Sequence, residues 1–291
     1  MAQVTAALVK QLRQMTDSPM MECKKALVEA DGDIDKAVDI LRTMGIAKAV
    51  KRAGRATNEG TIATYVSPDG TVGALLELTC ETDFVGTNPK FTGFAAKLAQ
   101  VVAENDPADV EALKACPFEG ETVDSALIEM IHVIGENMKI VRFQRVSAPK
   151  GGLGSYVHLG GKLADIVAFE FSDPQTGSTE EFKTFAHDVA MQVAASAPVA
   201  ANRESVPEDV VAHELAIYKA QAAESGKPEA IQERMAQGRL EKYFKEFVLT
   251  EQVFVKDSNL TISQLAQKVS KSVGDQIKVV SFVRFVFGET A

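Results

Sequence analysis

The first 55 residues carry apolar side chains at the spacing of helices. In the first predicted helix they recur three or four positions apart, at Val4, Leu8, Leu12 and Met15. Asp17 and Ser18, the N-cap candidates before Pro19, predict the start of a second helix. Asp33 predicts the start of a third helix that Gly45 ends. Three short helices bury little core, so this head is predicted to be a docking module and not a site of chemistry.

After the head the apolar period changes to two. In "VGALLELTC", residues 72–80, alternate apolar positions predict a β-strand. Four residues after this strand, Phe84 stands in a polar segment with turn-forming residues, where a large apolar side chain has no obvious place to be buried. Phe84 is therefore a candidate functional residue, unless it folds back onto the helix that is predicted to begin near Phe91.

Comparison of the chain with itself shows an internal repeat. "FTGFAAKLAQVVAENDP" begins at Phe91, and the similar "FKTFAHDVAMQVAASAP" begins 91 positions later at Phe182. "GENMKIVRFQRV" begins at Gly135, and "GDQIKVVSFVRF" begins 139 positions later at Gly274. Each copy reads strand, strand, helix, helical segment, strand. This order predicts an α+β fold, with helices on one face of a small, mostly antiparallel three-stranded sheet in each copy.

The second copy is longer than the first by about 48 residues. Two helical patterns separated by "SGKP" predict an antiparallel hairpin of helices, a coiled-coil arm, at about 205–248. The alternative is a helix pair packed inside the core. The predicted domains are a three-helix head, core subdomain N, and core subdomain C with the inserted arm, at residues 1–55, 56–147 and 148–291.

Composition excludes several classes of protein. Hydrophobic residues make up 46% of the chain and charged residues 24%, as in soluble globular proteins. The net charge of −9 argues against direct nucleic-acid binding, which needs a basic face. We expect no secretory signal and no membrane span, because no suitable apolar run occurs. Three dispersed cysteines fit a reducing cytoplasm and predict neither a disulfide framework nor a metal site.

No catalytic constellation is found in the sequence. The four histidines lie in unrelated predicted elements, without a zinc-binding spacing. The glycine-rich "GGLGSYVHLGGKL" fails as a phosphate-binding loop, because Leu163 follows Gly161-Lys162 where Ser or Thr is required. We therefore expect no catalytic residue, no metal and no cofactor.

The two copies of the repeat differ at one loop. "TDFV" at 82–85 aligns with "DPQT" at 173–176, which reads as an ordinary turn. The first copy thus carries an apolar pair beside Asp83 that the shared scaffold does not require. This difference makes Thr82, Asp83, Phe84 and Val85 the candidate functional loop.

Several segments resemble one family. The head sequence "VKQLRQMTDSPMMECKKALVEADGDIDKAVDILR", the motif "ETDFV", the stretch "HDVAMQVAAS" and the "LTEQVFVKD" that follows the hairpin are similar to the bacterial elongation factor Ts family, in order and over nearly the whole chain. The resemblance implies a head like a ubiquitin-associated domain. It also implies guanine nucleotide exchange on the GTPase elongation factor Tu during translation, without covalent chemistry.

The resemblance also implies roles for individual residues. Asp83 and Phe84, with Thr82 and Val85, would act beside the magnesium site of the GTPase. The other partner contacts that it implies are Arg13, Met20, Met21, Lys24, Gln192, Phe254 and Val255. Members often carry His where this chain has Gln192, and some carry a C-terminal helical module that the printed sequence does not include.

Two other classes stay open from the residues alone. One is a scaffold or chaperone that holds a partner by its helical arm, and the other is an unrecognised enzyme. A scaffold does not need the TDFV loop, so this loop separates it from an exchange factor. A homodimer, or a higher complex with the partner, is left open by the sequence.

Overall fold

The computed structural model describes residues 4–289. By their internal contacts these residues form two compact units. The first contains residues up to 63 together with 76–143, and the second contains 64–75 together with 144–289. The predicted domain boundaries at 55 and 147 stay predictions, and the two units are described separately.

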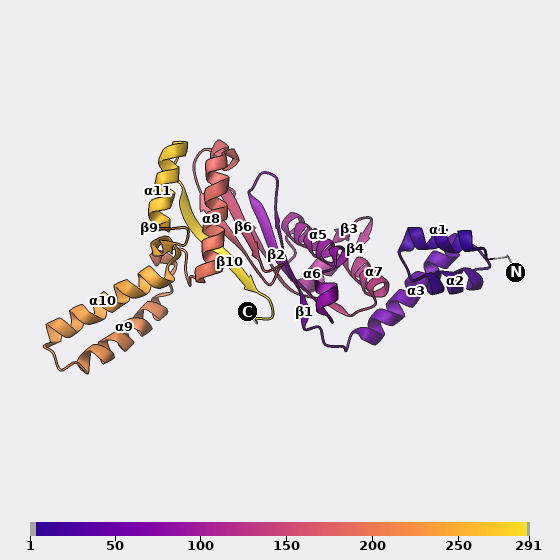
Figure 1. The fold of residues 1–291 in the computed structure, drawn as a ribbon, viewed down its shortest axis with the longest axis horizontal. Coiled ribbons are helices and arrows are strands. Elements are labelled where there is room, and N and C mark those ends of the chain that lie inside the picture. Colours follow the sequence, from indigo (N-terminus) through magenta and orange to yellow (C-terminus); the bar gives the residue numbers. More distant parts are fainter. Residues whose placement is uncertain (1–3, 290–291) are drawn as a thin grey trace. The chain divides into compact units, whose positions relative to one another are not determined.

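The head, in the first unit, consists of three helices around a small apolar core (Figure 1). Their bounds are α1 Ala6–Thr16, α2 Met20–Glu29 and α3 Ile34–Arg52. Asp33 caps α3 as predicted, since its carboxylate accepts the Lys36 N–H at 3.1 Å. The prediction for α2 was wrong by one residue. Its N-cap is Pro19, without a side-chain hydrogen bond, and Ser18 is buried.

Gly45 does not end the third helix, contrary to the prediction. A glycine stops a helix by adopting positive φ, but Gly45 keeps a helical backbone and α3 continues to Arg52. Gly45 and Ala49 are buried. A Cβ on Gly45 would lie 3.5 Å from His132, which lies in helix α7 (Val123–Ile134), so this part of α3 packs on the core of the unit. Packing overrides the weak helix propensity of glycine here.

A three-stranded sheet in the order β1-β2-β5 follows the head. Its strands are β1 Glu59–Val66, β2 Val72–Cys80 and β5 Met138–Ser147. The intervening elements are α4 Asp83–Gly86, α5 Pro89–Asn105, α6 Val110–Ala115, β3 Pro117–Phe118, β4 Glu121–Thr122 and α7 Val123–Ile134. Strand β2 is buried from its second residue to its last, and Glu77 within it is neutralised by Arg142 Nε at 2.8 Å.

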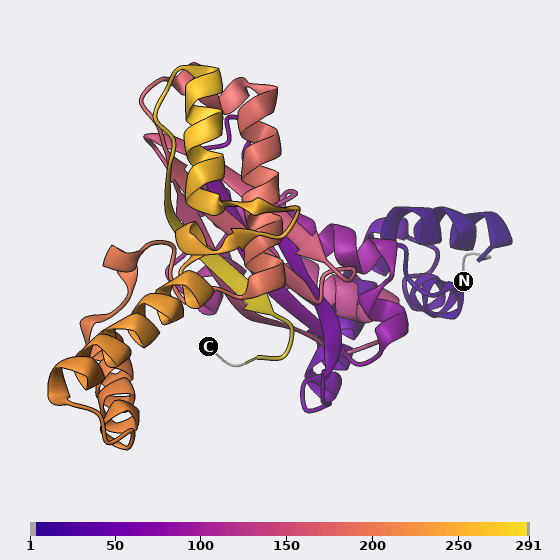
Figure 2. The ribbon, with the colours of Figure 1, turned by 60° about the vertical axis from the view of Figure 1, so that its left-hand side comes forward.

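The second unit contains an antiparallel sheet in the order β10-β7-β6. Helices α8 and α11 lie side by side along one face of it (Figures 1 and 2). The bounds are β6 Gly151–His158, β7 Leu163–Glu170, η1 Pro174–Ser178, α8 Glu180–Ser196, α11 Ile262–Val273 and β10 Lys278–Val286. Phe169, Phe182 and Phe185 pack ring to ring in the core between sheet and helices.

The predicted repeat is confirmed in the arrangement of elements. Helices α5 and α8 both have 17 residues and start 91 positions apart. Helices α7 and α11 both have 12 residues, start 139 positions apart and end at a glycine with positive φ. Each copy places its second strand in the middle of its sheet. The chain is therefore an α+β protein with small antiparallel sheets.

The additional residues of the second copy form a pair of helices joined by a short turn (Figure 2). The bounds in this region are η2 Arg203–Ser205, α9 Glu208–Ala223, α10 Glu229–Phe247, η3 Leu249–Glu251, β8 Val253–Phe254 and β9 Asp257–Thr261. Only the base of the pair has a substantial core, formed by Ala200, Val206, Leu240, Phe244 and Val248. The two helices therefore pack mainly on each other.

Candidate functional site

The TDFV segment forms one helical turn directly after strand β2. Thr82 is the N-cap of this turn, α4, and its hydroxyl accepts the Val85 N–H. The Phe84 side chain is 84% exposed, whereas Val85 is 8% exposed. The alternative in which Phe84 packs onto the helix that contains Phe91 is therefore wrong, and Phe84 faces outward.

Three features hold α4 while Phe84 stays exposed. Val85 is buried. Gly86 lies so close to strand β1 that a Cβ on it would be 3.3 Å from the Gly60 nitrogen. Asp83 closes the turn, because its carbonyl accepts the N–H and the hydroxyl of Thr87, each at 3.1 Å. These contacts hold the turn in place while the Phe84 ring stays exposed.

Asp83 is also exposed and lies beside Phe84 in the chain. Its carboxylate accepts the backbone N–H of Phe84 at 2.9 Å. The turn thus exposes an aromatic ring and a carboxylate on adjacent residues.

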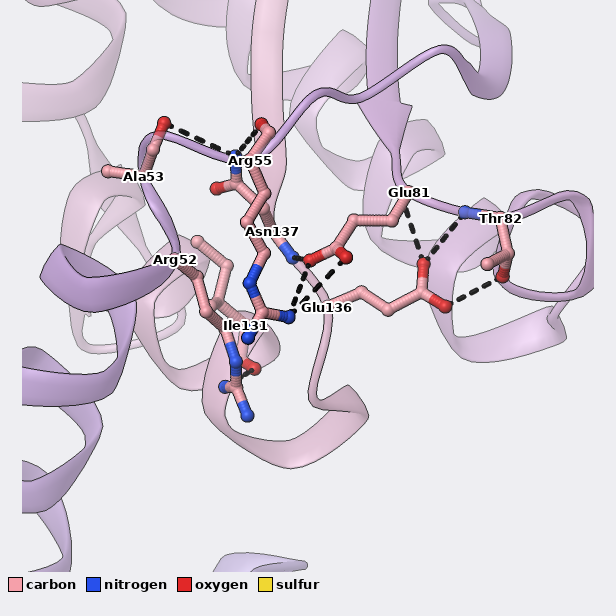
Figure 3. A network of polar contacts seen from close by, with 8 residues as sticks. All are labelled: Arg52, Ala53, Arg55, Glu81, Thr82, Ile131, Glu136 and Asn137. Carbon is pink, nitrogen blue, oxygen red and sulfur yellow. Dashed lines mark hydrogen bonds and ion pairs between the residues drawn. The ribbon is translucent and has the colours of Figure 1, made fainter.

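A polar network ties the start of this loop to the segment between α7 and β5 (Figure 3). The Glu136 carboxylate accepts the N–H groups of Glu81 and Thr82, at 3.1 and 3.0 Å. The Glu81 carboxylate in turn accepts the N–H of Asn137 at 2.6 Å and pairs with Arg55. Glu136 therefore holds the backbone at Glu81 and Thr82, and Glu81 holds the backbone at Asn137.

The head residues named in the sequence analysis lie on exposed surface. Met20 and Met21 are 53% and 63% exposed on α2, and Lys24 is exposed one turn further along the same helix. Arg13 is exposed on α1. These residues belong to the first unit, as the TDFV turn does.

Gln192, Phe254 and Val255 form a cluster in the second unit. Gln192 is buried; its amide oxygen accepts the Val255 N–H at 2.9 Å and its nitrogen donates to the Val253 carbonyl at 3.2 Å. Phe254 is buried in the core, whereas Val255 is half exposed. Of the three, only Val255 exposes its side chain, and Gln192 fixes the backbone that carries it.

Sequence reasoning did not identify Glu136 and its network. The relevant signal was present, since the Gly135-Glu136 pair aligns with Gly274-Asp275 in the second copy. What the sequence does not display is the hydrogen bonding, because Glu136 and its partners are 54 and 55 positions apart.

Among residues 4–289, no group of His, Cys, Asp and Glu is placed to hold a metal ion. Within the same range, the helices are too short or too polar to cross a membrane.

The fold and the site together define a duplicated α+β protein whose distinctive exposed feature is an aromatic ring on a fixed helical turn. Residues 81–289 match the family model described as "Elongation factor TS". The chain belongs to the elongation factor Ts family, and so to the elongation factors of translation.

Curated relatives agree over nearly the full length. Elongation factor Ts of Trichlorobacter lovleyi is 44% identical over 289 residues, which cover 98% of this chain and 93% of the relative. The corresponding protein of Clostridium kluyveri is 43% identical with the same coverage. That of Nitratidesulfovibrio vulgaris is 43% identical, over 99% of this chain and 97% of the relative.

Proposed function

We propose that the chain is a guanine nucleotide exchange factor for the GTPase elongation factor Tu. The observation that carries this proposal is Phe84, a ring that is 84% exposed on a turn fixed by its neighbours in a member of the elongation factor Ts family. A large apolar side chain held in water gains about 1.5–3 kcal/mol when a partner buries it. Such a residue is useful to a protein whose task is to bind.

Exchange follows from linkage between two ligands of one GTPase. A factor accelerates nucleotide release if it binds the nucleotide-free GTPase more tightly than the loaded one. Weakening nucleotide binding by roughly 100- to 1000-fold requires about 2.7–4 kcal/mol of coupling. Burial of Phe84 in the complex supplies part of this energy. Asp83, entering beside the magnesium site, supplies the rest by dislodging the ion that holds the phosphates. No bond is made or broken, so no catalytic residue is required.

Contacts outside the loop hold the partner while the nucleotide leaves. Met20, Met21 and Lys24 on α2, with Arg13 on α1, give the head an exposed face of adaptable thioethers and positive charge. We propose that this UBA-like head binds the nucleotide-binding domain of the GTPase. Val255, supported by Gln192 and Phe254, provides a contact from the second unit, and the hairpin α9–α10 serves as a coiled-coil arm.

The test is the release of a fluorescent GDP from purified elongation factor Tu, with excess unlabelled GDP, in the presence and absence of the chain. We expect substoichiometric chain to accelerate release without a metal or cofactor of its own, under conditions like those of the bacterial cytoplasm. Binding to the GTPase with an unchanged release rate would instead favour a scaffold that only holds its partner.

A further inference from the structure

The Glu136 carboxylate is the fixed end of a chain of hydrogen bonds that leads to the turn carrying Phe84. One of its oxygens accepts two backbone N–H groups, from Glu81 and Thr82. The other accepts the Thr82 hydroxyl proton at 2.6 Å. Having donated to Glu136, this hydroxyl presents its lone pairs to the Val85 N–H in the first turn of α4. Glu136 thereby sets the orientation of the N-cap of α4.

Glu136 is itself held in place, at the junction between helix α7 and strand β5. It follows Gly135, the left-handed C-cap of α7 with φ +91°, and β5 begins two residues later. On its other side, the Asn137 side chain donates to the Arg55 carbonyl at 2.9 Å, and its backbone N–H donates to Glu81 (Figure 3). A carboxylate that accepts three donors makes charge-assisted bonds, which are stronger than neutral ones.

The second copy of the fold has the same arrangement of hydrogen bonds around an acidic residue, without the aromatic ring. Asp275 follows Gly274 and accepts the N–H of Ser172 at 3.0 Å and the N–H of Asp173 at 2.8 Å. It also accepts the Thr176 hydroxyl at 2.9 Å. Hydrogen bonds from the Asp173 N–H, the Thr176 hydroxyl and the Ser172 N–H lower the pKa of Asp275. This arrangement of hydrogen bonds therefore belongs to the duplicated scaffold. In the first copy it holds the turn that carries Phe84.

We propose that Glu136 is a positioning residue for nucleotide exchange: it fixes the Thr82 cap, so that Phe84 is presented in one orientation before the partner arrives. This inference rests on the proposed exchange function. Without the carboxylate, two backbone N–H groups and the cap hydroxyl lose their common acceptor. The turn then samples other conformations, and the apparent affinity of the loop falls by the fraction that remains competent.

The test measures GDP release from elongation factor Tu over a range of factor concentrations, with matched variants of the full chain. Glu136→Ala should slow release by about 10-fold, if about one tenth of the turns stay in the competent conformation. Glu136→Gln keeps an acceptor oxygen for the two N–H groups and should recover part of the loss. Asp275→Ala removes the same bonds from the second copy and should leave release at the wild-type rate.

Coupling to Phe84 separates positioning from a general loss of structure. If Glu136 acts through the turn, most of the Glu136→Ala defect should disappear in a Phe84→Ala background, and only the share exerted through Asp83 should remain. Thr82→Val, which removes only the hydroxyl, gives a second variant should Glu136→Ala fail to fold; it should slow release and should also have a much smaller effect without the ring.

Three results would overturn the inference: wild-type release by Glu136→Ala, an equal defect in Asp275→Ala, or additive effects with Phe84→Ala. If the unaltered chain does not accelerate GDP release at all, it is the exchange function that fails, so the two failures are distinguishable.

Discussion

Phe84 and Val85 are neighbours in the sequence but have opposite environments. The hydrophobic pattern marks both as unusual in a polar loop and cannot tell which of them is exposed. Their directions follow from the helical turn that Thr82 caps and from the close approach of Gly86 to Gly60. The sequence thus allowed the candidate loop to be predicted, but the division into one exposed and one buried residue required the backbone.

The substitution Phe84→Ala tests whether the ring serves a partner. It should change the free energy of unfolding by no more than about 0.5 kcal/mol, because an exposed side chain contributes little to the free protein. It should nevertheless slow GDP release strongly, because the lost burial exists only in the complex. Phe91→Ala is the matched control. Phe91 is fully buried, so the same change there should cost about 3–5 kcal/mol.

Thermal unfolding and GDP release would be measured on the same samples. Wild-type exchange by Phe84→Ala at wild-type stability would exclude the ring from the mechanism. A large loss of stability in the same variant would instead mean that the ring packs on the protein.

Asp165 in β7 is a buried acid that the proposed function does not use. Both carboxylate oxygens are buried and lack a hydrogen-bond partner among the described residues. Burial raises the pKa of Asp165 to about 8, against the opposing charge of Arg284 on the neighbouring strand β10. The native protein therefore keeps this proton up to a higher pH than the unfolded chain does. Stability should fall as the pH rises from about 4 to 8.

The variant Asp165→Asn should remove this dependence, since the amide is neutral at every pH. Its advantage in unfolding free energy over the unaltered chain should grow between pH 5 and 8 by up to about 4 kcal/mol, at about 1.36 kcal/mol per pH unit. Urea unfolding at several pH values measures this difference. A difference that stays constant over this range would mean that Asp165 is already ionised and paired with Arg284.

At the scale of elements, the repeat was the most informative feature of the sequence. Helices α8 and α11 coincide with α5 and α7 at the offsets that the sequence comparison indicated. Local rules were less reliable: Gly45 lies within α3, where buried packing against α7 outweighs its tendency to end a helix. Long-range bonds were not predicted at all, and Glu136 is the main example.

The helical pair α9–α10 is an insertion relative to the first copy, so part of it should be removable without loss of the fold. Removing the whole predicted arm, about 205–248, would cut into its base, because Val206 and Val248 are buried there with Ala200. Replacing residues 221–239 with a short glycine-rich turn keeps this base. Ala222 and Ala236 are the fully buried side chains that the cut removes. At about 0.8 kcal/mol per buried methyl, the loss of stability should be about 1–2 kcal/mol.

Chemical denaturation followed by circular dichroism checks this expectation. A single cooperative transition at slightly lower denaturant is the expected outcome. Loss of cooperative unfolding would show that the outer half of the pair is needed for the fold. The matched control replaces Phe244 with Ala at full length. Phe244 is buried in the base cluster, so this variant should be destabilised by more than the truncation.

At the scale of the whole molecule, the candidate contacts lie in both units. The Asp83–Phe84 loop and the face of α2 belong to the first unit, and Val255 belongs to the second. We expect contacts at a distance from the loop to contribute affinity for any state of the partner. Only contacts made better with one state of the GTPase shift its nucleotide equilibrium. This division separates binding from exchange.

Coupling between two ligands of one protein is reciprocal, so GDP must weaken the chain's binding by the same factor by which the chain weakens GDP binding. With roughly 100- to 1000-fold coupling, the dissociation constant of the chain should rise by that factor between nucleotide-free and GDP-saturated elongation factor Tu, which corresponds to about 2.7–4 kcal/mol. Isothermal titration calorimetry with both forms measures it. Phe84→Ala should reduce the ratio, because the loop provides the state-dependent contact. Met21→Ala on α2 should weaken both forms alike and leave the ratio unchanged. Equal affinity of the unaltered chain for the two forms would rule out exchange by this route, however tightly it binds, since a ligand with no preference between two states shifts neither.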